Sequence, residues 1–565
     1  MSRAGSATNP FDVVVIGGGH NGLVAAGLLA KRGARVTVLE RRDTVGGAAI
    51  TEQPWGPEYK VTALSYVVSL MPPQIQRELQ LAKHGYRVYP QGPYFAPRPD
   101  GRALALPSDP VRRREQIAQF SVRDADAYDR WEEWLGDVAA LLAPLLTETP
   151  PNLGSHRPAD LFDQARLGWT ARRWSPRAIA DVTRLFTMSI ADLLEDTFES
   201  DAMRGVLAVS GVIGTWAGPR SPGTAYVMAH HQIGDSVGAD AGGDHREGER
   251  ELGAWGFPEG GMGSVTRALR DAAESFGATV RTDVDVDQII VVDGEARGVV
   301  TSTGEEVLGD IVIATTHPKI TFLDQLPTSQ LPDDFVADIR RWKTRSGTVK
   351  VNVAVDRLPE FTARPGFDPE VHGGTIVLAP SLDHVENAFQ DAVAGRPAAA
   401  PFADICIPSV FDPTLAPAGK HVVSMFTQWV PHTWNDEPHT ADLDAYADRV
   451  IAAVDAVAPG FTDSILHRQV IGPHAMEHTY GLIGGNIFHG ELTPSQLFHL
   501  RPAPGYADYR TPIRNLYQAS SATHGGGGVT GIPGLKVVDQ IAADHRSRGR
   551  RARAGVRSRL RRFVD

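Results

Sequence analysis

The sequence FDVVVIGGGHNG, at residues 11–22, decides the fold that we expect for this chain. Its first six residues are a short, continuous apolar run, which is typical of a strand buried on both faces of a parallel sheet. Three glycines follow at the spacing G-x-G-x-x-G, and residues 23–32 have the pattern of a helix. A strand, a glycine-rich turn and a helix in this order predict the first unit of a Rossmann-like, dinucleotide-binding domain.

Each residue of this turn has a physical role. Gly17 permits the tight turn, Gly19 lets a pyrophosphate approach the backbone, and Gly22 lets the helix pack closely against the strand. At His20 and Asn21 the helix begins, and its first N–H groups and partial positive charge are offered to the phosphates.

A second apolar run, residues 35–39, ends in Glu40, which is followed by Arg41. A carboxylate at this place accepts hydrogen bonds from the hydroxyls of the adenosine ribose and disfavours a 2′-phosphate. Because strand, glycines, helix, strand and acid occur in order, we expect these residues to bind a dinucleotide.

A second pair of glycines, Gly46 and Gly47, extends the motif and is followed by Ala48. This extension resembles the flavoprotein superfamily that contains the amine oxidases and phytoene desaturases, which implies FAD as the cofactor. Many members have arginine where this chain has Ala48, so one cationic contact to the cofactor is missing here. By the same resemblance, the backbone of Val286 is expected to meet the adenine.

The C-terminal part of the chain has a third glycine-rich segment. A strand is expected at residues 516–521 and a helix from residue 533 to about 543, with four consecutive glycines between them. Such a run lowers stability through chain entropy, so it indicates close approach to a ligand. The residues expected to face the flavin here are Ser521, Gly526, Gly527, Gly528 and Val529.

The resemblance is more specific to the phytoene-dehydrogenase-related branch of the superfamily, and it extends over most of residues 11–545. The matching motifs are GHNGL at 19–23, GGAA at 46–49, SPGTAYV at 221–227, HH at 230–231, GAWG at 253–256 and NIFHG at 486–490.

We expect an α/β fold in which the FAD-binding domain is discontinuous, at residues 10–75, 255–325 and 490–545. The two insertions, residues 76–254 and 326–489, are expected to form an α+β substrate domain. Within them we predict helices at 124–146 and 181–195, strands at 348–354 and 421–426, and a mobile loop at 234–250.

Composition excludes several classes of protein. The single cysteine, Cys406, excludes a disulfide-reductase pair, and its apolar neighbours disfavour a covalent flavin link, so we expect non-covalent FAD. No run of apolar residues is long enough to span a membrane, and the polar N-terminus predicts no secretory signal, which favours a cytoplasmic protein. We find no metal-ligand spacing.

The charge is unevenly distributed. Nine arginines and one aspartate lie at residues 546–565, a net +8 in a chain of net −11. We expect a disordered, solvated tail, with peripheral contact to anionic lipid heads as the alternative. The rest of the chain is strongly acidic and would repel nucleic acid.

The resemblance implies an FAD-dependent dehydrogenase, desaturase or oxidase that acts on an apolar small molecule such as a terpenoid or carotenoid. Because no second dinucleotide fingerprint is present, we expect O₂ or a quinone as electron acceptor rather than NAD(P). The alternatives are a carotenoid ketolase and a flavin-bound scaffold protein without turnover. The candidates for proton exchange are His524, His230 and His231, although for the pair a packed, structural role is favoured.

Overall fold

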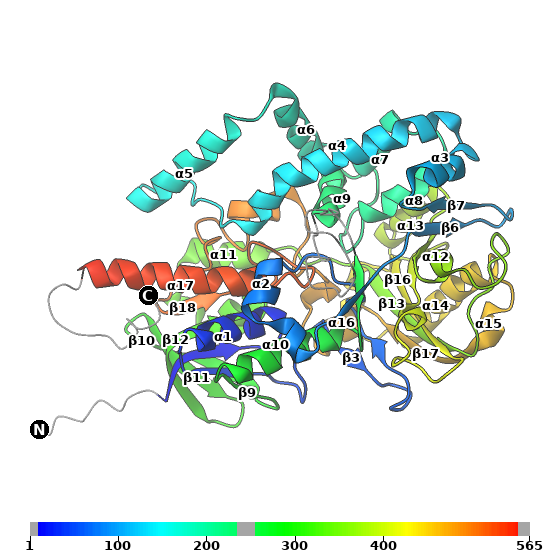
Figure 1. Ribbon diagram of the computed structural model, residues 1–565. Helices are drawn as coiled ribbons and strands as arrows, with labels where there is room; N and C mark the ends of the chain where they lie inside the picture. Colours follow the sequence, from blue (N-terminus) through cyan, green and yellow to red (C-terminus); the bar gives the residue numbers. More distant parts are fainter. Residues whose placement is uncertain (1–9, 234–254, 552–565) are drawn as a thin grey trace, which may run out of the picture.

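The computed structural model of the chain describes residues 10–233 and 255–551 and contains two seven-stranded sheets (Figure 1). In the first sheet the strands follow the order β10-β11-β12-β1-β2-β9, and β18 lies beside β12. These strands are β1 (Phe11–Ile16), β2 (Val36–Leu39), β9 (Thr279–Arg281), β10 (Val286–Val292), β11 (Glu295–Thr301), β12 (Glu306–Ala314) and β18 (Leu516–Gln518).

The centre of this sheet is β1, which pairs in parallel with β2 on one side and β12 on the other. Strand β12 serves three partners, because its first residues pair antiparallel with β11 and its last residues pair in parallel with both β1 and β18. Side chains of β1 are buried from Asp12 to Ile16, which explains the continuous apolar run. The predicted Rossmann-like α/β fold is therefore confirmed.

Helix α1 (His20–Lys31) follows β1 after a three-residue turn and packs against α10 (Met262–Ser275) and α17 (Ile532–Arg551). The turn needs glycine for steric reasons. Gly17 has a φ of +98°, and a β-carbon on Gly22 would lie 2.2 Å from the carbonyl oxygen of Gly17. The close packing of α1 on β1 thus depends on the missing side chain at Gly22.

The second sheet has the strand order β17-β13-β16-β15-β14-β6-β7. Its inner strand β13 (Thr348–Val355) is buried at every residue and lies between β16 and β17. Its hydrophobic core is shared with helices α13 (Leu382–Val393) and α14 (Thr440–Asp455). The remaining strands are β6 (Tyr94–Pro97), β7 (Ala103–Leu106), β14 (Thr375–Leu378), β15 (Phe402–Cys406), β16 (His421–Gln428) and β17 (Ile465–Ile471).

Helices form a layer that Figure 1 shows across the top of the molecule. Its bounds are α3 (Pro110–Ala118), α4 (Val122–Thr147), α5 (Pro158–Ala171), α6 (Pro176–Thr187), α7 (Ile190–Thr197), α8 (Asp201–Ser210) and α9 (Thr224–Gln232). The single helix predicted at 181–195 is two helices, because Ser189 and Asp192 form a capping box that begins α7.

Three further differences from expectation concern boundaries. Helix α11 (Asp333–Arg341), which we assigned to the substrate domain, packs with the core of the first sheet. Strand β18 ends at Gln518, three residues before the predicted end. Helix α17 continues to Arg551, so residues 546–551 of the predicted disordered tail are helical. The rest of that tail and the loop predicted at 234–250 lie outside the described residues.

The remaining elements are short. Two-stranded sheets are formed by β3 (Thr51–Glu52) with β4 (Val61–Thr62), and by β5 (Val88–Pro90) with β8 (Gly256–Pro258); the remaining α-helices are α2 (Pro73–Glu78), α12 (Pro369–His372), α15 (Phe461–Ser464) and α16 (Pro473–His478). Among the described residues we find no helix with the length and apolar character needed to cross a bilayer.

Candidate functional site

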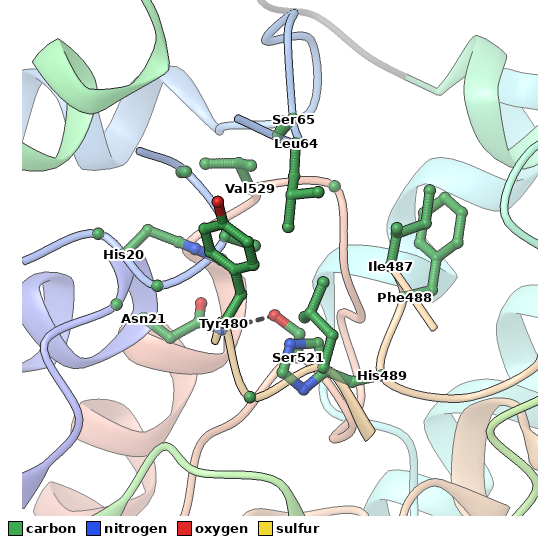
Figure 2. A pocket seen from close by; sticks show the side chains of 18 of the residues that line it. His20, Asn21, Leu64, Ser65, Tyr480, Ile487, Phe488, His489, Ser521 and Val529 are labelled. Carbon is green, nitrogen blue, oxygen red and sulfur yellow. Dashed lines mark hydrogen bonds between the residues drawn. The ribbon is translucent and has the colours of Figure 1, made fainter. Parts of the chain in front are cut away.

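A cavity of about 490 Å³ is lined by residues of both seven-stranded sheets. The first sheet contributes Ile16 and Leu39 at the ends of β1 and β2, and the second contributes Thr348 and Lys350 from β13. Its volume is typical of small-molecule and cofactor sites. Figure 2 shows part of the lining, in which residues from the first and last hundred positions of the chain lie side by side.

At one end of the cavity lies the predicted phosphate-binding turn. Gly17, Gly19, His20 and Asn21 all line the cavity. Gly19 is the N-cap of α1, and no side chain among the described residues caps this helix end. Its backbone N–H groups are therefore free to bind an anion. A β-carbon on Gly19 would meet no described atom within 4 Å, so the space in front of this glycine is open.

Three buried polar atoms beside this turn have no hydrogen-bond partner among the described residues: Nε2 of His20, Oδ1 of Asn21 and Nδ1 of His489. All three residues line the cavity, and Figure 2 shows them grouped around Ser521. Buried polar groups are normally paired, so these atoms indicate a missing polar ligand. Donors and acceptors around an uncapped helix end fit the phosphates and ribose of a dinucleotide.

Glu40 is held rigidly at the end of β2. Its carboxylate accepts hydrogen bonds from the backbone N–H of Gly18 at 2.7 Å and of Arg42 at 3.0 Å, and the residue is buried. Carboxylate oxygens accept more than one hydrogen bond each, so Glu40 retains capacity for ribose hydroxyls. Arg41 also lines the cavity and donates to the carbonyl of Thr479.

The second glycine pair is attached directly to the first turn. The N–H of Gly46 donates to the carbonyl of Gly18 at 3.0 Å, and Gly46 and Gly47 have φ values of +135° and +59°. Both glycines and Ala48 line the cavity. The two glycine segments thus present adjacent stretches of backbone to one ligand.

The other predicted cofactor contacts are partly brought together. Val286 lines the cavity, as do Ser521, Gly528 and Val529 from the third glycine segment. Two members of that segment, Gly526 and Gly527, are not among the lining residues. A β-carbon on Gly527 would lie 3.0 Å from Phe488, so this glycine permits close packing of two loops instead.

Of the three histidines expected to exchange protons, only His231 lines the cavity. Its Nδ1 lies 2.8 Å from the carbonyl of Val227, so Nδ1 carries the proton. The rings of His230 and His524 are buried outside the cavity lining, which corrects the expectation that His524 is the best placed. The ring of His524 packs at 6.1 Å from that of Phe498. Burial lowers the pKa of His231 and His524 to about 4 and that of His230 to about 3, so all three are neutral near pH 7.

A polar cluster that we did not predict as catalytic lines the cavity where β13 and β15 meet it. Its members are Lys350, Asp404 and Tyr66, and the ammonium of Lys350 lies 4.0 Å from the centre of the Tyr66 ring. Lys350 also donates a hydrogen bond to Ser424. Burial lowers the pKa of Lys350 to about 7 and raises the pKa of Asp404 to about 6. Both groups can therefore change protonation near neutral pH.

The sequence carries a signal for this cluster, because Lys350 interrupts the valine-rich run TVKVNVAV of a strand that is buried on both faces. A lysine in such a run is unusual unless the chain uses it.

Comparisons with known proteins agree with this geometry. A model of the NAD(P)-binding Rossmann-like domain matches residues 15–77, and a model of the flavin containing amine oxidoreductases matches residues 223–534, more than half of the chain. The chain belongs to the flavin containing amine oxidoreductase family. Membership gives the open space at Gly19 and the unpartnered polar atoms around it their ligand, which is FAD.

Within this family the chain is similar to the rat protein named pyridine nucleotide-disulfide oxidoreductase domain-containing protein 2, with 38% identity over 96% of this chain and 95% of that one. It is 25% identical to a limonene dehydrogenase component of Castellaniella defragrans, over 95% and 96% of the two chains. Among solved structures, cyclohexylamine oxidase from Brevibacterium oxydans has the same fold, with a TM-score of 0.54, 16% identity, and coverage of 95% and 98%.

The family model and the relatives confirm the predicted flavoprotein resemblance, the oxidoreductase class and the cofactor FAD. The word disulfide in the rat protein's name has no counterpart here, because Cys406 is the single cysteine of the sequence and is buried in β15.

Proposed function

We propose that this chain is an FAD-dependent dehydrogenase or oxidase that acts on a small, largely apolar molecule of terpenoid type carrying one polar group. The observation that supports this most is the continuity of the cavity, which runs from the phosphate-binding turn to the Lys350 cluster on the second sheet. A cofactor bound at the turn and a substrate bound against the second sheet would share one enclosed space.

The substrate end of the cavity is mainly aromatic and apolar. The residues of this kind that line it are Leu64, Tyr66, Tyr94, Ile213, Trp255, Phe426, Ile487 and Phe488. Such walls favour an apolar substrate and exclude water from the reacting atoms. Two distant relatives carry names that fit this substrate class, the limonene dehydrogenase component and a phytoene desaturase.

The polar group of the substrate would be recognised by the Lys350 cluster. Asp404 is 6% exposed, and its Oδ1 has no hydrogen-bond partner among the described residues. A hydroxyl or similar group on the substrate would satisfy this buried oxygen, whereas a pure hydrocarbon would leave it unpaired. We therefore favour a functionalised terpenoid over an unsubstituted carotenoid.

When bound, FAD supplies the two-electron chemistry, and the protein binds, orients and handles protons. Lys350 is the group best suited to hold or release a proton, because its lowered pKa keeps part of the population neutral at pH 7. The imidazole of His231, with its proton on Nδ1, orients the wall of the same chamber. As electron acceptor we retain O₂ or a quinone.

The test begins with the absorption spectrum of the purified protein, before and after denaturation. A flavin spectrum with release of FAD is the expected result. Substrates are then screened under anaerobic conditions by bleaching of the flavin, with monoterpene alcohols, unsubstituted terpenes and amines as separate panels. Reoxidation by O₂, a quinone and NAD⁺ identifies the acceptor. Bleaching by amines alone, or by no compound, would contradict the proposed substrate class.

A further inference from the structure

Arg501 is a buried cation without a carboxylate partner. It is 2% exposed, and no described Asp or Glu oxygen lies within 4 Å of its guanidinium. Its hydrogen bonds go to backbone carbonyls instead. Their acceptors and distances are Thr523 at 3.1 Å, Gln496 at 3.4 Å, Phe488 at 2.7 Å and Ser521 at 2.9 Å. Buried charges are usually paired, so this arrangement is unusual for arginine.

The guanidinium lies directly behind the cavity wall. Phe488 and Ser521, whose carbonyls it binds, both line the cavity, while Arg501 itself does not. The hydroxyl of Ser521 accepts a hydrogen bond from Asn21 at 3.2 Å, which Figure 2 shows as a dashed line. Since Asn21 belongs to the first turn of α1, Arg501 is placed behind the phosphate-binding end of the cavity.

The charge of Arg501 is felt inside the cavity. His489 and His317 both line the cavity, and burial is the main cause of their lowered pKa values, to about 3 for His489. The positive charge of Arg501 lowers both pKa values further. In surroundings of low dielectric a guanidinium acts over several ångströms, and an anion in the same cavity would be stabilised as these imidazolium ions are destabilised.

Other cations near the phosphate-binding turn are less effective. Arg42 is paired with Glu52 at 3.4 Å, and Arg41 is exposed to solvent, which screens its charge. The position after the second glycine pair is Ala48 and has no charge.

We propose that Arg501 is the counter-charge of the FAD pyrophosphate, acting from behind the wall without touching the cofactor. Through its four carbonyl contacts it also joins the loop at Phe488 to the loop at Ser521 and so fixes the shape of this wall. It is a positioning residue, not a catalytic one. The inference rests on the binding of FAD, and arginine suits the role because it stays charged when buried.

The experiment compares full-length wild type with Arg501→Gln and Arg501→Lys, all stripped of flavin, and measures the binding of FAD, ADP and adenosine by calorimetry. Adenosine occupies the same end of the site without a phosphate charge. For Arg501→Gln we expect at least tenfold weaker binding of FAD and ADP and less than a twofold change for adenosine. Arg449→Gln is the matched control, because Arg449 also binds a carbonyl and stacks on an aromatic ring, on the second sheet.

Equal affinities of Arg501→Gln and wild type for ADP would overturn the counter-charge. So would an equal loss for ADP and adenosine, which would show a purely structural clamp. Wild type that binds no FAD would instead contradict the cofactor assignment, so the two failures are distinguishable.

Should Arg501→Gln fail to fold, Arg501→Lys decides the question alone. A buried lysine has a lowered pKa and loses its charge as the pH rises, whereas arginine does not. The ratio of FAD affinities, Arg501→Lys to wild type, should therefore fall at least tenfold between pH 6 and pH 9. A ratio that is independent of pH would overturn the proposal.

Discussion

Glu40 illustrates how much of the cofactor site depends on single side chains. Its carboxylate fixes the backbone of Gly18 within the phosphate-binding turn and that of Arg42 after the strand. It therefore organises the site as well as offering oxygens to a ribose. A residue that only contacted the ribose would not be buried behind the turn in this way.

Glu40→Ala is expected to weaken FAD binding at least tenfold. It removes the ribose acceptor and leaves two backbone N–H groups unpaired, each costing about 1–3 kcal/mol where it stays buried. Glu40→Gln keeps one acceptor oxygen and should give an intermediate loss. Titration of the stripped protein with FAD, followed by flavin fluorescence, measures both. Wild-type affinity in Glu40→Ala would show that the carboxylate has no part in the site.

Lys350 is expected to reduce stability in exchange for function. Its pKa falls from 10.5 in the unfolded chain to about 7 in the folded one, so the unfolded chain binds the proton more tightly. The resulting penalty is fully present below pH 7 and disappears as the pH rises through 10.5.

Lys350→Met should therefore raise the free energy of unfolding by about 1–3 kcal/mol at pH 6, after allowance for the lost hydrogen bond to Ser424. The gain should vanish near pH 10.5, and turnover should fall at every pH. Chemical denaturation and anaerobic flavin reduction test the two parts separately. A stability gain that is the same at pH 6 and pH 10.5 would contradict the assigned titration.

At the scale of the elements, the β1–α1 turn separates two uses of glycine. A β-carbon on Gly22 would collide with the carbonyl of Gly17, whereas one on Gly19 would enter open space that faces the cavity. Gly19 has a φ of −72°, which alanine adopts without strain. The first glycine is needed by the fold and the second by the ligand.

Gly22→Ala is thus expected to lower the apparent melting temperature of the flavin-free protein, corresponding to about 1–3 kcal/mol, and to weaken FAD binding as a result. Gly19→Ala should leave the melting temperature of the flavin-free protein unchanged and weaken FAD binding at least tenfold. Differential scanning fluorimetry with and without FAD distinguishes the two. Identical behaviour of the variants would show that the turn does not divide its roles in this way.

Elements with a local signal could be predicted from the sequence, and those set by distant contacts could not. The run at β1, the glycine spacing and Glu40 identified the phosphate-binding turn, because each role there is defined by close neighbours in the chain. The position of His524 depends on the path of the loop after β18, which no local pattern determines. The joining of Lys350, Asp404 and Tyr66 likewise requires three strands and a loop to be placed first. The break between α6 and α7 did have a local signal, the capping box at Ser189.

At the scale of the whole molecule, the cavity joins the two sheets. Residues of the first sheet and of β13 line the same space, so a ligand that fills it contacts both. FAD is accordingly expected to stabilise the whole protein, not the Rossmann-like part alone.

Removal of FAD should lower the apparent melting temperature, and addition of FAD at one hundred times its Kd should restore about 2.7 kcal/mol of stability. Hydrogen exchange should then quicken in the α1 turn and also in β13, while α14 provides an internal reference away from the cavity lining. Loss of protection confined to the first sheet would mean that the sheets are stabilised independently.

The order of strands in the first sheet has a consequence for the synthesis of the protein. The centre strand β1 needs β12, which is translated roughly 300 residues later, or about 15–60 s at 5–20 residues per second. During that time an apolar segment waits on the ribosome without its partner and is a natural target for chaperones. The wall at Ser521 and Val529 is made last. Cofactor loading is therefore a step that follows translation, and a prematurely terminated chain would emerge colourless.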